Sequence, residues 1–203
     1  RWLFLKVETD AGIHGWGEPV LEGHARASEA AVLELGELLI GHDPRRINDI
    51  WQLLYRNGCY RGGPILMSAI SGIDTALWDI LGKSLGVPVH ELLGGAQRDR
   101  IRTYSWIGGD EPGDLVGDAL AALDQGFDAV KFNATGPLRM IDSRRSIDEV
   151  SSRIGRLRDA VGNRLDLAID FHGRVHTPMA AQLLRELEPV SYTHLTLPTT
   201  PYV

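Results

Sequence analysis

The sequence has few cysteines and no long apolar segment. Cys59 is its one cysteine in 203 residues, which excludes an internal disulfide framework and favours a reducing compartment, so we expect a cytoplasmic protein. No run of about 18 apolar residues is present, and no basic stretch followed by an apolar segment begins the chain, so we expect neither a membrane span nor secretion. Acidic residues outnumber basic ones, 27 to 21, and the net charge of −6 argues against a nucleic-acid partner.

The first hundred residues combine a hairpin with helices. Strand-like residues on either side of the turn at 10–12 predict two paired strands. Apolar residues at helical spacing predict helices over 25–40 and about 65–85. Between them, the Asp43-Pro44 pair indicates the N-cap and first position of another helix. We therefore expect an α+β domain over residues 1–100.

From residue 101 the pattern changes to alternating strands and helices. The strand-like segments IRTYSWIG, AVKFNA and LDLAIDFHG are each followed by a helical pattern, over 112–125, 143–161 and 177–188. This alternation predicts an α/β fold with a parallel sheet, made of three βα units over residues 101–190. In such a fold, functional residues lie at the C-terminal ends of the strands.

The last residues break this pattern. Threonine, proline and tyrosine follow Val190 with neither helical nor clean strand spacing. We expect residues 191–203 to be foreign to the fold, as a linker or as a sequencing or cloning artefact. We expect residues 1–190 to be the interior of a longer protein.

The third strand-like segment ends with two ionisable residues. In LAIDFHGRV, Asp170 and His172 are two residues apart, and strand geometry places both on one face. The carboxylate is a candidate Mg²⁺ ligand because hard cations take oxygen ligands, and the imidazole is a candidate proton donor or acceptor. Alternatively, the two side chains bond each other and cap a loop. The position at a βα strand end favours the functional interpretation.

Two further pairs are candidate substrate-binding residues. Lys131 and Asn133 end the second strand-like segment; the lysine could be a base with a lowered pKa, hold an anionic group, or extend to water at the rim of the sheet. The glycine-rich segment 57–64 could be a lid in which Tyr60 and Arg61 meet an anionic substrate, or a plain connection between helices.

Several motifs taken together resemble one known family. An α+β domain that leads through GIDTALWDILGK and HELLGG into a barrel whose third strand ends in DFHGRV resembles the enolase superfamily, in its mandelate racemase-like branch. GWGEPV, YRGGPILMSAISGID and YSWIGGD are similar to the same branch. The resemblance covers about residues 1–190 and implies a capping domain followed by the first three βα units of a truncated (β/α) barrel.

The resemblance also implies a reaction. It is Mg²⁺-dependent β-elimination of water from a sugar acid, with galactonate as the expected substrate, in a full-length parent enzyme that is a homo-oligomer. Asp170 matches the first metal ligand of the family, and His172 matches the acid that assists departure of hydroxide. Racemase-type members carry K-x-K where this chain has Lys131-Phe132-Asn133, and an amide cannot take an α-proton. The remaining ligands and the base belong to later strands, so we expect the present chain alone to be inactive.

Two other functions fit the same residues. One is dehydration of a related sugar acid, gluconate or mannonate, because specificity depends partly on the loops of the capping domain. The other is a non-catalytic module that binds a sugar acid or a protein partner.

Overall fold

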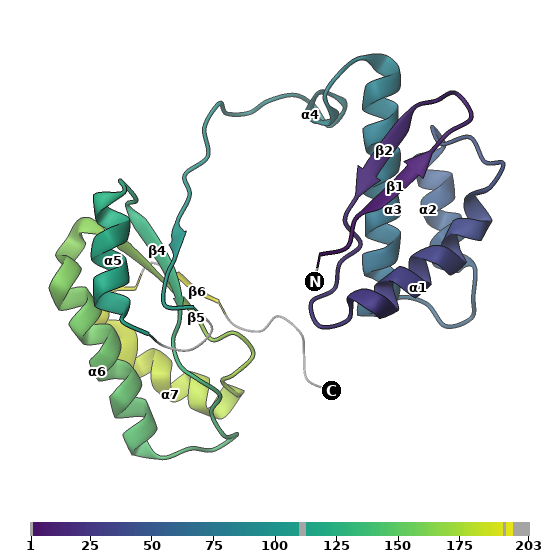
Figure 1. Cartoon of the computed structure of the whole chain (residues 1–203). Coiled ribbons are helices and arrows are strands. Elements are labelled where there is room, and N and C mark those ends of the chain that lie inside the picture. The colour runs from purple at the N-terminus through teal and green to yellow at the C-terminus, as the bar shows by residue number, and fades with distance from the viewer. Residues whose placement is uncertain (1, 110–112, 193, 197–203) are drawn as a thin grey trace. The chain divides into compact units, whose positions relative to one another are not determined.

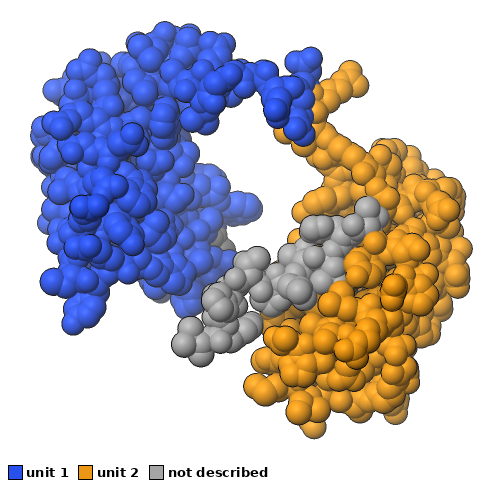
Figure 2. Space-filling view, turned by 180° about the vertical axis from the view of Figure 1, so that it is seen from behind, with its two compact units in different colours: residues 1–99 blue, residues 100–203 orange. Residues whose placement is uncertain are grey.

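A computed structural model of the chain describes residues 2–109, 113–192 and 194–196 (Figure 1). The chain divides into two compact units, Arg1–Asp99 and Arg100–Val203, which Figure 2 colours separately. Each unit has its own hydrophobic core.

Unit 1 combines an antiparallel hairpin with helices. In chain order its elements are β1 (Leu5–Glu8), β2 (His14–Gly17), α1 (Ala25–Gly36), the 3₁₀ helix η1 (Glu37–Leu39), α2 (Ile47–Arg56), α3 (Pro64–Leu85) and α4 (Val89–Leu92). The hairpin, α1 and α2 all contact α3, which passes behind the two strands in Figure 1. Helix α3 is therefore the centre of this unit.

Strand β2 lies directly on the backbone of α3. A Cβ atom built on Gly15 would be 2.0 Å from the carbonyl oxygen of Ala76, and one on Gly17 would be 1.9 Å from that of Gly72. Only glycine fits at these two positions, because any side chain would collide with helix backbone.

Helix α3 is long and apolar enough, by length and composition alone, to cross a membrane. However, its residues Ile70, Ile73, Leu77 and Ile80 are buried in the core of unit 1, together with residues from α1 and α2. A core helix of this kind meets the same criteria as a membrane span, so we interpret α3 as the core helix of unit 1.

The predicted start of α2 is wrong. The Asp43 carboxylate accepts hydrogen bonds from the amide and the guanidinium of Arg45, and the amide of Arg46 donates to the Asp43 carbonyl at 3.0 Å. These bonds close a separate turn, so the helix begins at Ile47 with Arg46 as its N-cap.

Unit 2 has the predicted alternation of strands and helices. Its elements are β3 (Ser105–Trp106), α5 (Leu115–Asp124), β4 (Ala129–Asn133), α6 (Arg144–Val161), the 3₁₀ helix η2 (Gly162–Arg164), β5 (Asp166–Asp170), α7 (Thr177–Leu187), the 3₁₀ helix η3 (Glu188–Val190) and β6 (His194–Thr196). The strands pair in parallel in the order β3-β4-β5-β6, and α6 packs between α5 and α7 (Figure 1). The α/β fold with a parallel sheet and three βα units is confirmed.

Strand β6 was not predicted. Residues 194–196 pair with the edge of β5, where Thr196 is the partner of Asp170. An open strand edge offers unpaired backbone groups to any segment able to extend, and threonine favours strands. Residues 193 and 197–203 lie outside the described part of the chain, so the foreign origin of 191–203 stays a prediction.

The two central strands, β4 and β5, present an apolar face and a polar face. Val130, Phe132, Leu167 and Ile169 are fully buried in the core that the helices of unit 2 share. By alternation, Lys131, Asn133 and Asp170 point to the other face. The pairing register places Asn133 opposite Asp170, so these polar side chains meet at the C-terminal edge of the sheet.

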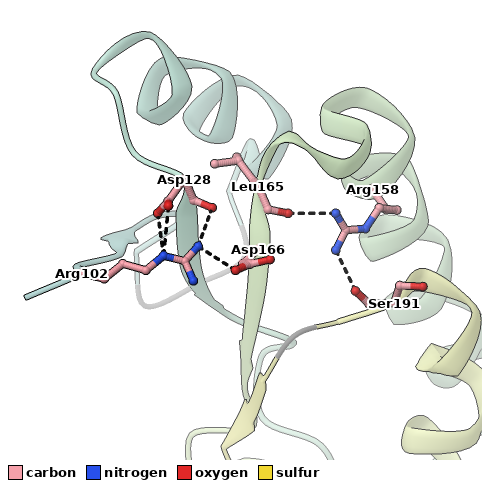
Figure 3. A network of polar contacts seen from close by, with 6 residues as sticks. All are labelled: Arg102, Asp128, Arg158, Leu165, Asp166 and Ser191. Atoms are coloured by element: carbon pink, nitrogen blue, oxygen red, sulfur yellow. Dashed lines mark hydrogen bonds and ion pairs between the residues drawn. The ribbon is translucent and has the colours of Figure 1, made fainter.

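Ion pairs hold the opposite, N-terminal edge together (Figure 3). The Arg102 guanidinium donates to the carboxylates of Asp128, at 3.0 Å, and Asp166, at 2.7 Å. Nearby, Arg158 donates to the carbonyl oxygens of Leu165 and Ser191, both at 2.9 Å. At this edge Arg102 and Arg158 both donate to partners within unit 2.

Candidate functional site

Asp170 is the centre of the polar group at the C-terminal edge of the sheet. It is the last residue of β5 and is only 6% exposed. Its Oδ2 accepts a bond from Lys131 Nζ at 2.9 Å, and its Oδ1 accepts one from the His172 amide at 2.7 Å. Burial alone would raise the pKa of Asp170, but these bonds and the lysine charge outweigh burial and hold the pKa below its ordinary value of 3.8. The carboxylate is therefore ionised at neutral pH.

His172 reaches the site by a turn rather than by strand alternation. Strand β5 ends at Asp170, so the same-face argument does not apply to His172. Instead, His172 has a φ of 47° and Gly173 a φ of 66°, and the Arg174 amide donates to the Phe171 carbonyl at 2.8 Å. Two successive positive φ values within such a bond are typical of a type I′ turn. This turn places His172 Nδ1 3.5 Å from Asp170 Oδ2, with the side chain 43% exposed.

Lys131 points at Asp170 and not to water. Its side chain is 21% exposed, which excludes the interpretation as a rim lysine. The hydrogen bond to Asp170 and the charge of that carboxylate raise the pKa of Lys131 above 10.5, against the effect of burial. The alternative of a base with a lowered pKa is therefore wrong, because the side chain is an ammonium at neutral pH.

Two aromatic residues of the site were missed from the sequence. The Lys131 ammonium lies 5.4 Å from the ring centre of Trp106 and 5.9 Å from that of Tyr104, within the range of cation–π attraction. The Trp106 ring is also 6.4 Å from the His172 ring. The signal was available, because Tyr104 and Trp106 end their strand segment with the same two-residue spacing as Lys131 and Asn133.

Asn133 lies beside Asp170 and is only 2% exposed. Its amide nitrogen is 3.5 Å from the Gly109 carbonyl oxygen, in the loop that follows β3. Tyr60 and Arg61 belong to unit 1; Tyr60 is 95% exposed, and the Arg61 guanidinium donates to the Gly58 carbonyl of its own loop at 3.1 Å. Their contribution to a substrate site stays a prediction.

The Asp170 carboxylate is suited to be one ligand of a hard cation such as Mg²⁺. Asp170 offers carboxylate oxygens at a strand end and already has a cation, the Lys131 ammonium, against it. Within residues 2–109, 113–192 and 194–196, no three His, Cys, Asp or Glu side chains gather in a group that could hold a metal. The described residues therefore do not supply a complete set of metal ligands, and Asp170 is at most one member of such a set.

Comparison with known proteins identifies two successive domains of one family. Residues 1–94 match the mandelate racemase/muconate lactonizing enzyme N-terminal domain, and residues 114–201 match the enolase C-terminal domain-like family. The D-galactonate dehydratase of Xanthomonas euvesicatoria pv. vesicatoria (strain 85-10) is 61% identical over 189 residues, 93% of this chain and 50% of the relative. That of Ralstonia nicotianae (strain ATCC BAA-1114 / GMI1000) is 60% identical over the same shares. The chain thus spans about half the length of these relatives.

Comparison with solved structures gives the same family. A member of the enolase superfamily from Salmonella Typhimurium has a TM-score of 0.88 at 30% identity, over 99% of this chain and 59% of that one. An enolase from Pantoea ananatis with bound D-gluconate and Mg has a TM-score of 0.83 at 29% identity, over 96% and 55%. With both domain matches and the fold in agreement, this chain belongs to the mandelate racemase/muconate lactonizing enzyme branch of the enolase superfamily.

Proposed function

We propose that this chain is part of a Mg²⁺-dependent acid-sugar dehydratase that acts on D-galactonate. The reaction removes water across C2 and C3 of the sugar acid, and the enol that forms tautomerises to a 2-keto-3-deoxy acid. The observation that carries the proposal is the buried, ionised carboxylate of Asp170, with a lysine ammonium and an imidazole around it at the C-terminal edge of a parallel sheet. The similarity to D-galactonate dehydratases supports the choice of substrate.

Asp170 would bind the metal ion. Its carboxylate is of the type that Mg²⁺ prefers, and burial restricts competition from water. When bound, Mg²⁺ would supply positive charge that neutralises the substrate carboxylate and the negative charge that develops when the α-proton leaves. In the structure the Lys131 ammonium lies 2.9 Å from Asp170 Oδ2, so the site also holds a positive side chain that would attract an anionic substrate.

His172 would donate a proton to the departing 3-hydroxyl group. Its imidazole is exposed toward solvent on one side, and the turn at 171–174 fixes its backbone. Hydroxide is a poor leaving group, and a positioned acid contributes about 10²–10⁴-fold to such a step. Asn133 is an amide, Lys131 is already an ammonium and His172 would act as the acid, so the base would come from a part of the enzyme outside this chain.

The proposal is tested in a chimera, because the chain spans half of its relatives. The matched 189 residues replace their counterparts in the Ralstonia relative, and formation of 2-keto-3-deoxy acid from D-galactonate is measured. We expect turnover in the chimera. Asp170→Asn should reduce turnover more than about 100-fold, because loss of even an outer-shell group at a metal site costs 10–100-fold.

A matched control lies at the other end of the same strand. Asp166→Asn makes the same change at the N-terminal edge of β5, where Asp166 pairs with Arg102, and should retain turnover. A chimera that folds and binds Mg²⁺ but dehydrates none of galactonate, gluconate and mannonate would overturn the proposal.

The role of His172 is tested by separating two steps. Asparagine tolerates positive φ, so His172→Asn removes the imidazole and keeps the turn. We expect dehydration to fall about 10²–10⁴-fold while the C2 proton still exchanges with solvent deuterium. His176→Asn, four residues along the chain, should change neither rate. Dehydration at the unsubstituted rate in His172→Asn would exclude the role.

Gluconate is the alternative substrate. A neighbour at 29% identity was solved with D-gluconate and Mg bound, and gluconate differs from galactonate only in configuration at C4. Comparing kcat/KM for the two epimers in the chimera decides between them.

The chain itself should be inactive. Asp170 is a single acidic ligand, and Mg²⁺ is held weakly by one carboxylate because the ion gives up its water reluctantly. Residues 1–203 incubated with D-galactonate and excess Mg²⁺ should form no product above a no-protein control. The parent enzyme would be a homo-oligomer. It would lie in the cytoplasm, where the exposed thiol of Cys59 stays reduced.

A further inference from the structure

Both oxygens of the Asp170 carboxylate are already engaged. Oδ1 accepts the His172 amide at 2.7 Å, and Oδ2 accepts the Lys131 ammonium at 2.9 Å. A cation that approaches this carboxylate therefore meets either a backbone amide, which the turn fixes, or a lysine side chain, which can move. The ammonium lies at Oδ2, the oxygen whose partner can move aside for a metal ion.

The Lys131 ammonium also has a second set of neighbours. The Trp106 ring centre is 5.4 Å away and the Tyr104 ring centre is 5.9 Å away. Both rings belong to the neighbouring strand segment and are partly open to solvent, with exposed fractions of 42% and 52%. Their faces attract a cation by their negative charge density. An ammonium that left Asp170 would thus remain in an environment that favours it.

A divalent ion and the ammonium cannot share Asp170 Oδ2 without strong repulsion, because both are positive and water is largely excluded. We propose that Lys131 is a place-holding cation: its ammonium neutralises Asp170 until a divalent ion binds, and then moves onto the faces of Trp106 and Tyr104. This inference rests on the proposed function, since the ion it concerns is the one that Asp170 would bind there.

The displaced ammonium would then serve the substrate. Both ring centres lie within 5.9 Å of its present position, so the released ammonium would remain near the carboxylate and would offer its hydrogens to the anionic end of a sugar acid. Metal binding would in this way prepare the anion site, and the two ligands would bind in order.

Unit 1 contains a lysine–aspartate pair without this arrangement. Lys83 Nζ is 2.7 Å from Asp79 Oδ2, on the same helix four residues apart, and also donates to the His14 carbonyl at 2.9 Å. That pair links helix α3 to the hairpin. It provides a matched control, because Lys83→Met makes the same chemical change where no metal is expected.

The experiment measures Mg²⁺ affinity without substrate. Calorimetry on the chimera compares the unsubstituted protein with Lys131→Met, Lys83→Met and Asp170→Asn. We expect Lys131→Met to bind Mg²⁺ more tightly, because no ammonium has to leave Asp170 first, and the gain should be on the order of tenfold, a size typical of coupling between two binding events. Lys83→Met should leave the affinity unchanged, and Asp170→Asn should abolish binding.

A second measurement follows the ammonium. Mg²⁺ should change the tryptophan fluorescence of the unsubstituted chimera, and this change should be absent from both Lys131→Met and Trp106→Phe. If Lys131→Met fails to fold by circular dichroism, Lys131→Gln replaces it, because glutamine keeps a polar end.

The outcomes are distinct. Equal or weaker Mg²⁺ binding in a folded Lys131→Met or Lys131→Gln variant overturns the place-holding role, and would show that the lysine only positions Asp170. Equal Mg²⁺ binding in Asp170→Asn and the unsubstituted protein overturns the metal assignment itself. Tighter binding in the lysine variants, with loss of the fluorescence change, supports the inference.

Discussion

Unit 1 and unit 2 bury different kinds of side chain. Among the described residues, Ser28 is the buried polar side chain of unit 1, and it is uncharged. Unit 2 buries Asn133, Thr135 and Asp170, all in or just after the last positions of β4 and β5. In unit 1 the hairpin is held by close backbone contact with α3, whereas unit 2 places polar groups on one face of its sheet.

The residues that stabilise unit 1 are therefore packing residues, whereas unit 2 also buries residues that could bind a ligand. Burying the Asp170 carboxylate costs folding free energy that its pairing with Lys131 offsets, whereas the apolar contacts of unit 1 have no such cost. We therefore expect changes in the packing of unit 1 to leave the contacts of Asp170 unchanged, and changes at Asp170 and Lys131 to leave the core of unit 2 in place.

Gly17→Ala should break unit 1. The new methyl group would lie 1.9 Å from the Gly72 carbonyl oxygen, so the hairpin must move off α3. We expect the free energy of unfolding of unit 1 to fall by about 3 kcal/mol or more, the upper end for overpacking. Four of the five tryptophans, Trp2, Trp16, Trp51 and Trp78, belong to unit 1, so denaturant titration followed by fluorescence reports mainly on this unit.

The control is Gly36→Ala in α1, where an added methyl group meets nothing within 4 Å. It should leave unit 1 equally or more stable, because alanine favours a helix. A Gly17→Ala protein as stable as the Gly36→Ala protein would show that β2 does not depend on its contact with α3.

The Lys131–Asp170 pair should make unit 2 sensitive to pH at both extremes. The folded pKa of Asp170 is below 3.8, so its contribution is present above that value and is lost as pH falls through the lowered pKa. The folded pKa of Lys131 is above 10.5, so its contribution is present below that value and is lost as pH rises through the raised pKa. Denaturant unfolding at several pH values, followed by circular dichroism, measures both.

The doubly substituted protein Asp170→Asn/Lys131→Gln should lose this part of the pH dependence and keep the rest. An unchanged pH profile in the double variant would mean that the pair contributes nothing to folding.

Arg102→Gln should have the smallest effect of the three. Arg102 joins Asp128 and Asp166 at the N-terminal edge of the sheet, but the ion pairs are largely exposed and salt screens them. We expect a small decrease in the thermal midpoint of unit 2, larger at low salt, and no change in Mg²⁺ affinity of the chimera. Arg145→Gln removes a pair within a single helix and should change neither quantity. A loss of Mg²⁺ affinity in Arg102→Gln would show that the two edges of the sheet are coupled.

The sequence predicted the fold where its signals are local. Helix α3 runs from Pro64 to Leu85 against a prediction of about 65–85, because its apolar stripe is long and Gly86 ends it in the left-handed conformation. The predicted start of α2 was wrong because the Asp43 carboxylate accepts hydrogen bonds from Arg45 and so does not cap the helix. Strand β6 was not predicted because it forms by pairing with the edge of β5. The residues of β6 alone give no sign of that partner.

The site was predictable in its residue types but not in its contacts. Alternation brought Lys131, Asn133 and Asp170 to one face, but the direct bond between Lys131 and Asp170 depends on a diagonal across two strands that only the register determines. Tyr104 and Trp106 were overlooked because aromatic residues in a strand are usually read as packing residues.

The backbone amide proton of His172 is an NMR probe of this site. Its hydrogen bond to Asp170 Oδ1 is 2.7 Å long and ends on a charged acceptor, so its proton resonance should be shifted far downfield in an NMR spectrum. Whatever cation occupies the other oxygen draws electron density from the same carboxylate. The turn holds this backbone proton in place. Its chemical shift therefore reports which cation is bound to Asp170, the Lys131 ammonium or a metal ion.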